Sequence, residues 1–351
     1  MGNSNQFNKI GAGSYGKIFH QSGDPNAPAL KVPIYAPDEN TKWFIDWEFE
    51  IQKRIHGALA ESGIDIVVPF ARRLIAAEDD AWWTNHLPLF PPWEEHLLPR
   101  DTLAMDRIPA LSSEIRTGLT NQFCPATTAE AREKILGEKG AADGIARVYL
   151  GGRRRPRTER RPQSVFSLRN MNLWLDQLEE LQADVAAYAE TMAKTMAVMH
   201  WKVGSDARDV EFYLGDPPLR ERWLRLAPRP SLFNREVQLY LLDFNQVKTV
   251  SMDEEGVKSM VSAHAVNDPY YPKPLEEGLL EQDLWRRFRD AYLEKSSYLA
   301  QTETADKGET PAWAGLPQKF IDGVVEERQA KQAENARKKL AETAREAETT
   351  A

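Results

Sequence analysis

A glycine-rich turn near the N-terminus constrains this chain more than any other feature of its 351 residues. Gly11, Gly13 and Gly16 follow the pattern G-x-G-x-x-G, and glycine lets a backbone bend sharply and lie close to a ligand. Unpaired backbone N–H groups in such a turn can cradle phosphate. Dinucleotide-binding folds share this spacing, but there a helix follows the third glycine. Here the strand-like residues 17–20 follow, so the sequence predicts strand, turn, strand.

The segments after this turn carry a lysine and a glutamate that can act together. Residues 29–33 are apolar except for Lys31 and are predicted as the next strand. Residues 41–60 have the apolar spacing of a helix, with Glu48 and Glu50 on it. A glycine turn between strands and a lysine in the next strand are typical of the start of a protein-kinase fold. There, a helix glutamate pairs with the lysine. We expect Glu48 to be this partner, and Glu50 to be a solvated charge.

A set of acidic residues follows the clearest predicted helix, residues 184–201. Asp206, Asp209 and Glu211 lie within six residues, where kinases carry the catalytic loop H-R-D-x-x-x-x-N. Asp209 takes the place of the asparagine, and Gly204 stands where the catalytic aspartate belongs. The three carboxylates could bind metal, recognise a cation or act as a general base; the alternative is a solvated acidic turn. Asp209 and Glu211 would share one face of the strand predicted to follow.

Two further segments match kinase parts. An apolar strand ends in Asp243-Phe244, as does the strand that holds metal in kinases, although Asn245 replaces the usual glycine. Residues 103–109 read as the strand and hinge that join two lobes. Asp243 is therefore the acidic residue whose position is most typical of a kinase.

An arginine run stands out in an acidic chain of net charge −8. Arginine clusters can bind nucleic-acid phosphates by releasing counterions. A solvated loop is an equally good interpretation, because most charge runs behave that way. The six arginines, within nine residues, are Arg153, Arg154, Arg155, Arg157, Arg160 and Arg161.

Composition excludes several protein classes. The single cysteine, Cys124, excludes a disulfide framework and a cysteine metal cluster, and we expect no metal site. No run reaches the roughly 18 apolar residues of a membrane span, and the N-terminus lacks the apolar stretch of a signal peptide. We therefore expect a soluble, cytoplasmic protein.

Together these motifs resemble those of a group of fungal kinase-like proteins. Some members are similar to the arginine-containing cyclodipeptide synthases, which join arginine and a second amino acid from aminoacyl-tRNAs into a cyclic dipeptide in secondary metabolism. The segments that carry the resemblance are residues 166–170, 175–180, 199–202, 209–212, 242–245 and 267–272.

The resemblance implies an α+β, protein-kinase-like fold with two lobes. A small β-rich N-lobe would span residues 1–110. A larger helical C-lobe would span residues 111–300, with an insertion and the basic loop at about 151–162. Residues 301–351 would form a charged tail, helical or disordered.

If the chain catalyses aminoacyl transfer, the chemistry of its residues suggests a site and partners. Asp206 would accept a proton, and Asp209 and Glu211 would hold the arginine, with Asp243 as a further catalytic candidate. The glycine turn, Lys31 and Glu48 would line the pocket. The arginine run would bind aminoacyl-tRNAs, arginyl-tRNA among them, with no DNA or membrane partner and no required cofactor. The alternatives are a small-molecule kinase using ATP and Mg²⁺, and a pseudokinase-like binding protein.

Overall fold

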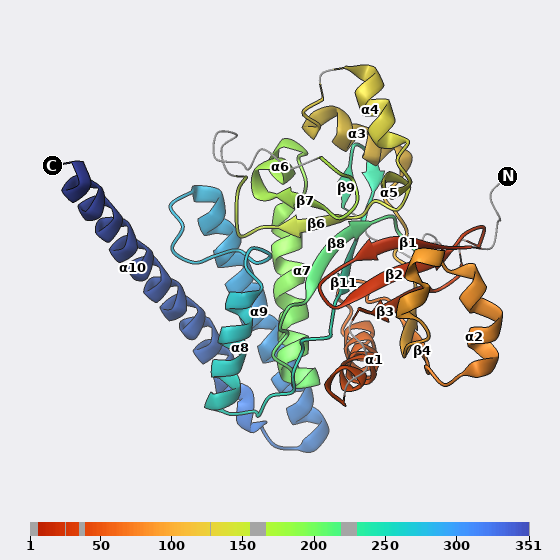
Figure 1. Cartoon of the computed structure of the whole chain (residues 1–351). Coiled ribbons are helices and arrows are strands. Elements are labelled where there is room, and N and C mark those ends of the chain that lie inside the picture. The colour runs from red at the N-terminus through yellow and green to blue at the C-terminus, as the bar shows by residue number, and fades with distance from the viewer. Residues whose placement is uncertain are drawn as a thin grey trace. The chain divides into compact units, whose positions relative to one another are not determined.

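The computed structural model describes residues 6–24, 26–34, 39–126, 128–154, 166–218 and 230–350. The chain mixes α and β structure, with a β-rich N-terminal region and a helical C-terminal region (Figure 1). It divides into two compact units at positions other than the expected lobe boundary at residue 110. The first unit comprises Met1–Val185 and Asp209–Val247, and the second comprises Ala186–Arg208 and Lys248–Ala351.

A five-stranded antiparallel sheet forms the N-terminal part of the first unit. Its two faces follow from the alternation of side chains along a strand. On β3, Leu30 and Val32 join one apolar cluster with Trp83 and Phe90, whereas Lys31 points to the opposite face, on which α1 lies. The strands, in the order β1-β2-β3-β5-β4, are β1 (Phe7–Ala12), β2 (Gly16–Gln21), β3 (Ala29–Pro33), β4 (Ala71–Ile75) and β5 (Thr102–Met105).

Both faces of this sheet are covered. The helix α1 (Glu39–Ala60) packs Ile45 and Phe49 against Leu103. The connection between β4 and β5 covers the other face with the tryptophan- and proline-rich cluster of Trp83 and Phe90. This connection contains α2 (Asp80–His86) and the short 3-10 helices η1 (Leu87–Leu89) and η2 (Pro92–Leu97).

A second sheet completes the first unit. Its strand order is β11-β8-β6-β7, with β6 parallel to β7 and the other pairs antiparallel. The strands are β6 (Ala146–Tyr149), β7 (Met171–Trp174), β8 (Glu211–Gly215) and β11 (Gln238–Leu242). The helices around it are α3 (Ser113–Phe123), α4 (Ala129–Leu136), α5 (Lys139–Ala142) and α6 (Leu175–Glu180), and a two-residue turn joins β9 (Ser231–Leu232) to β10 (Arg235–Glu236).

The second unit is helical in the part that the structure describes. Its elements are α7 (Val185–Val198, in this unit from Ala186), the π-helical turn η4 (Met199–Val203), α8 (Glu254–Val266), α9 (Leu279–Lys307), η6 (Ala312–Gly315) and α10 (Leu316–Thr350). Among the described residues, no helix is both long enough and apolar enough to cross a bilayer.

One expectation for the C-terminal region differs from the structure. The sequence predicts a loop over residues 302–315, but α9 continues to Lys307 and ends at Gly308, whose φ of 80° is easily adopted by glycine. The expected tail, residues 301–351, is helical over most of its described part. The helix α10 packs against α8, where a Cβ at Gly323 would lie 2.8 Å from Val261, and Phe320 is fully buried. The charged composition of residues 326–350 hides this anchoring, because the buried apolar side chains described for this helix lie in its first turns. They are Leu316, Phe320, Ile321 and Val324.

Candidate functional site

Three charged side chains meet at the centre of the first unit. The Nζ of Lys31 lies 2.5 Å from Oε1 of Glu48 and 2.9 Å from Oδ1 of Asp243. The side chains of Lys31 and Glu48 are 10% and 4% exposed, whereas Asp243 is 30% exposed. The expected ion pair between Lys31 and Glu48 is confirmed, and Asp243 joins it from a segment more than two hundred residues away.

Local structure positions each member of this cluster. Lys31 lies on the face of β3 that is turned towards α1. Glu48 lies on the buried stripe of that helix, with Ile45 one turn before it and Gln52 one turn after it. Asp243 directly follows β11 and has a φ of 66°, which turns the chain out of the strand. Such a conformation is uncommon for residues other than glycine, but aspartate adopts it more readily than most.

Burial and pairing set the charge states of the cluster. Burial by itself would lower the pKa of Lys31, but the carboxylates of Asp243 and Glu48 outweigh it and hold the pKa above its ordinary value. Burial raises the pKa of Glu48, and the adjacent Lys31 opposes that rise. Lys31 therefore remains a cation at neutral pH and holds the Asp243 carboxylate at the edge of a cavity.

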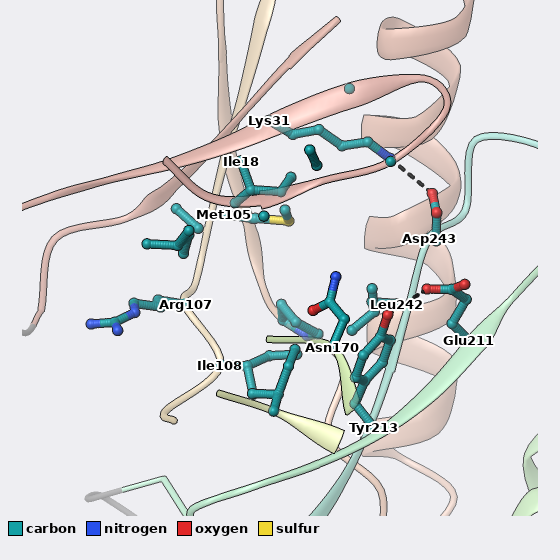
Figure 2. Close-up of a pocket in the computed structure, with 18 of the residues that line it drawn as sticks. Ile18, Lys31, Met105, Arg107, Ile108, Asn170, Glu211, Tyr213, Leu242 and Asp243 are labelled. Carbon is teal, nitrogen blue, oxygen red and sulfur yellow. Dashed lines mark hydrogen bonds and ion pairs between the residues drawn. The ribbon is translucent and has the colours of Figure 1, made fainter. Parts of the chain in front are cut away.

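The cavity, of about 160 Å³, lies beside this cluster. Figure 2 shows Lys31 and Asp243 on one side of it, with Tyr213, Ile108 and Asn170 across the space. Its walls include the glycine turn, the end of β5 with the segment 106–108 after it, and both sheets. The lining residues include Gly11, Gly13, Gly16, Lys31, Glu48, Asp106, Arg107, Ile108, Asp143, Arg147, Asn170, Glu211, Tyr213, Leu242 and Asp243.

The three glycines of the turn do not have the same role. A Cβ at Gly16 would lie 3.2 Å from the side chain of Lys31, so Gly16 allows the turn to approach the charged cluster. Among the described residues, no atom lies within 4 Å of a Cβ placed at Gly13. The N–H of Gly13 donates to the carbonyl of Gly16 at 2.9 Å, so this group closes the turn.

Side-chain contacts hold the hairpin that carries the glycine turn. The buried carboxylate of Glu94, in η2, accepts from Lys9 of β1 at 3.2 Å and from Lys17 of β2 at 2.5 Å. Arg169 donates from Nη2 to the carbonyl of Lys9 at 3.1 Å. The strands on both sides of the turn are therefore tied to neighbouring segments of the same unit.

A second polar group lines the cavity. Glu211 accepts from Tyr213 Oη at 2.8 Å and from Arg147 Nη2 at 3.0 Å, and Arg147 Nε donates to Tyr213 Oη at 2.5 Å. Glu211 and Tyr213 are two residues apart on β8, and Tyr213 is opposite Arg147 on β6. Burial raises the pKa of Tyr213, and the Glu211 carboxylate raises it further, so this phenol remains a hydrogen-bond donor.

The predicted acidic trio does not form one site. Only Glu211 lines the cavity. The strand β8 begins at Glu211, and Asp209 before it has a φ of 60°, so the expected alternation that would place both on one face stops short of Asp209. The Asp209 carboxylate accepts instead from the Gln246 side chain.

Asp206 belongs to the second unit. Its Oδ1 accepts from the backbone N–H groups of Lys248 at 2.9 Å and Arg208 at 3.1 Å. Burial raises the pKa of Asp206, and these N–H groups oppose the rise. This carboxylate caps a loop, a role that sequence spacing does not distinguish from catalysis.

Two of the six arginines of the basic run are described, and both pair with acidic residues of α6. Arg153 lies 2.5 Å from Glu179. Arg154 lies 2.5 Å from both Asp176 and Glu180. The other four, Arg155, Arg157, Arg160 and Arg161, lie outside the described residues.

Arg147, Asn170 and Tyr213 are among the cavity residues that sequence reasoning missed. Tyr213 could have been predicted from the sequence, because residues two apart on a strand share a face and Glu211 was already a candidate. Predicting that Arg147 lies at the cavity requires knowledge of the pairing of β6 with β8, which joins segments 66 residues apart. The place of Asn170 at the cavity depends on the backbone of a turn, and no local sequence pattern indicates that turn.

The comparisons with known proteins provide little functional information. A family profile described as "DUF3669: Zinc finger protein" matches residues 239–304, which is less than a fifth of the chain. Zinc fingers bind their metal through cysteine and histidine, and the matched segment contains no cysteine and one histidine, His264. The match therefore brings no zinc-finger ligand set with it. No curated protein matches the chain.

Proposed function

We propose that this protein is an arginine-containing cyclodipeptide synthase built on a kinase-like, two-lobed scaffold. It would take arginine and a second amino acid from aminoacyl-tRNAs and join them as a cyclic dipeptide for secondary metabolism. The motif resemblance suggests this activity, and the cavity of the first unit is the site to which we assign it.

The observation that carries the proposal is the charge of the cavity. Among the described residues, five carboxylates line it, against three cationic side chains. Two of these carboxylates already pair with arginines, Asp106 with Arg72 and Asp143 with Arg107. The arginyl group brings a guanidinium and an α-amine, and paired carboxylates bind guanidinium with charge-assisted hydrogen bonds. A nucleotide brings the opposite charge. The carboxylates are Glu48, Asp106, Asp143, Glu211 and Asp243, and the cations are Lys31, Arg107 and Arg147.

The chemistry requires only amide formation. The α-amine of one aminoacyl group attacks the ester carbonyl of the other, the C–N bond forms, and the ester C–O bond breaks. The released tRNA hydroxyl takes a proton, and the attacking amine loses one. A second attack, by the free amine of the dipeptide on its remaining ester, closes the ring and releases the second tRNA. Nothing is oxidised or reduced, and the esters are already activated.

From the geometry we assign roles that differ from those that the sequence suggested. Asp243 is the most accessible carboxylate of the buried cluster, so we assign to it the role of accepting the proton from the attacking amine. A positioned base contributes about 10²–10⁴-fold. Glu211 is oriented by Arg147 and Tyr213 and would contact the cationic substrate from the opposite wall. Asp206 and Asp209 receive no role in this cavity.

Mass spectrometry of the product tests the proposal. Purified protein is mixed with arginyl-tRNA and a set of other charged tRNAs, without ATP, and cyclic dipeptides containing arginine are sought. Asp243→Asn should reduce product at least tenfold. The surface substitution Asp290→Asn, whose side chain is 49% exposed in α9, should leave it unchanged. If wild-type protein forms no cyclic dipeptide, the proposal is wrong.

A small-molecule kinase is the second candidate, and the pair of Lys31 with Glu48 favours it. In that case Lys31 would bind the phosphates of ATP, and Asp243 would hold Mg²⁺. Adding ATP and Mg²⁺ to the same assay separates the two. An absolute requirement for ATP, or a phosphorylated product, supports the kinase. A protein that binds ligand and forms neither product is the pseudokinase-like alternative.

A further inference from the structure

Asn170 is a cavity residue that neither the catalytic assignment nor the charged clusters use. It lies directly before β7 and lines the cavity together with Arg147 and Tyr213. Figure 2 shows its side chain directed into the space between Ile108 and Leu242. Within the described part of the chain, its side-chain amide forms no hydrogen bond with the protein. The amide therefore offers a donor and an acceptor to a ligand.

The backbone of Asn170 is held in an uncommon conformation. Its φ is 52°, in the left-handed region, where asparagine is better tolerated than most residues. The two residues before it are fixed by their surroundings. Leu168 is 3% exposed, and its carbonyl would lie 3.0 Å from a Cβ at Gly144. Arg169 reaches across to the carbonyl of Lys9 on β1.

The fixed backbone of this turn therefore directs Asn170 towards the cavity. Left-handed residues other than glycine persist where the surrounding structure over-determines them, and they cluster at ligand-binding sites. The contact between Arg169 and β1 also ties the turn to the hairpin that carries the glycine turn. The position of the amide is thus coupled to the wall of the cavity above it.

The chemistry of the amide complements that of its neighbours. The carboxylates and cations of the cavity suit the charged ends of a substrate, whereas an uncharged amide suits a carbonyl. We propose that Asn170 contacts the substrate and that its N–H donates to the carbonyl oxygen of the aminoacyl ester. This inference rests on the proposed function. The carbonyl oxygen gains negative charge as the amine attacks, so the hydrogen bond strengthens in the transition state.

Two substitutions separate the side chain from the backbone. Asn170→Gly keeps the left-handed conformation and removes the amide, and Asn170→Asp keeps the shape and removes the donor. A matched control is Asn234→Gly. Asn234 has a φ of 58° and is exposed in the turn between β9 and β10. Removing one such donor from an acyl-transfer enzyme lowers kcat about 10²–10³-fold.

We expect both Asn170 variants to lower kcat for cyclic dipeptide formation at least tenfold, with a smaller change in KM. Asn234→Gly should match the wild type, and circular dichroism should show all three variants folded. Equal activity of Asn170→Gly and Asn234→Gly would overturn the inference while leaving the proposed function intact. Full activity of Asn170→Asp would exclude the role as donor.

A binding measurement separates failure of this inference from failure of the proposed function. If the wild type forms no product, the proposed function fails, and calorimetry with L-arginine methyl ester decides on Asn170. Binding at least tenfold weaker in Asn170→Gly than in Asn234→Gly supports the contact. Equal binding, or no binding to the wild type, overturns it.

Discussion

Each unit buries a cluster that contains a titratable side chain, and the two clusters differ in charge state. In the first unit, Lys31 and Glu48 form an ion pair that Asp243 extends to a cavity. In the second unit, His200 is 1% exposed, and its Nδ1 lies 2.9 Å from Tyr292 Oη. The Trp201 indole donates to the same hydroxyl at 2.9 Å. Burial lowers the pKa of His200 to about 3, so this histidine is neutral.

The difference shows that burial of a titratable group does not by itself indicate a reactive site. The charges of the first unit are stabilised by one another and reach a cavity lined by further polar groups. The histidine of the second unit is surrounded by aromatic rings, among them Phe320 at 4.8 Å and Tyr292 at 5.8 Å between ring centroids. The first arrangement can bind a charged ligand, and the second stabilises packing.

Removing Lys31 should have the largest effect on stability. Lys31→Met leaves the Glu48 carboxylate buried without its cation, and breaking a buried pair costs about 3–5 kcal/mol. Urea denaturation at neutral pH measures the loss. The control is Glu50→Gln on the same helix, because the Glu50 side chain is 60% exposed and should matter little. A Lys31→Met protein as stable as the control would show that the pair is not a buried charge cluster.

Acid should destabilise the second unit through His200. Its pKa is lower in the folded chain than in the unfolded chain, so only the unfolded chain takes up the proton between about pH 6.5 and 3. This contribution to stability is complete above pH 6.5 and decreases as the pH falls. Each pH unit below 6.5 lowers the free energy of unfolding by about 1.4 kcal/mol, so the loss reaches about 3 kcal/mol near pH 4.5.

Thermal unfolding at several pH values tests this. His200→Gln cannot take up a proton and should flatten the acid slope, although His264, with a pKa lowered by burial to about 4, would retain part of it. Lys31 does not make the stability depend on pH in this acid range. Its pKa is raised in the folded chain, so its stabilisation is lost only at strongly alkaline pH. An unchanged slope in His200→Gln would contradict the prediction.

A smaller effect is expected where Glu94 ties the glycine hairpin to η2. Glu94→Gln weakens the hydrogen bonds from Lys9 and Lys17, and a bond to a charged group is worth about 1.5–3 kcal/mol, less here because both lysines are partly exposed. Hydrogen exchange over residues 9–17 should accelerate. Glu114→Gln is the control, since Glu114 and Arg235 are about half exposed. Equal exchange in both variants would mean that Glu94 does not hold the hairpin.

The smallest effect is expected at the described end of the arginine run. Arg153 and Arg154 already pair with carboxylates of α6, so replacing both by alanine should weaken tRNA binding only a few-fold. Replacing the other four arginines should weaken it more, and should lower the salt slope by about 0.9 for each phosphate that is no longer neutralised. Filter binding between 50 and 200 mM salt measures both quantities. Unchanged affinity after both replacements would indicate a solvated loop.

Much of the fold was predictable because it depends on short-range patterns. The strands β1 to β3, the helix α1, the long helix α7 and the strand β11 occur close to the expected residues. The pairing of Lys31 with Glu48 was predicted from the motif context, since a helix glutamate pairs with the strand lysine in kinases. The membership of the cavity was less predictable. Three carboxylates close together in sequence suggested one site, but backbone angles at Asp209 separate it from Glu211.

Local periodicity is enough to predict which residues carry charge on which face of each strand and helix, because those faces repeat every two or 3.6 residues. Which of these charges meet depends on long-range contacts. Asp243 reaches Lys31 across 212 residues, and Arg147 reaches Glu211 through the pairing of β6 with β8. Such contacts depend on strand register and on the left-handed turn at Asp243. Neither is encoded in a local pattern, since both are stabilised by residues distant in the chain.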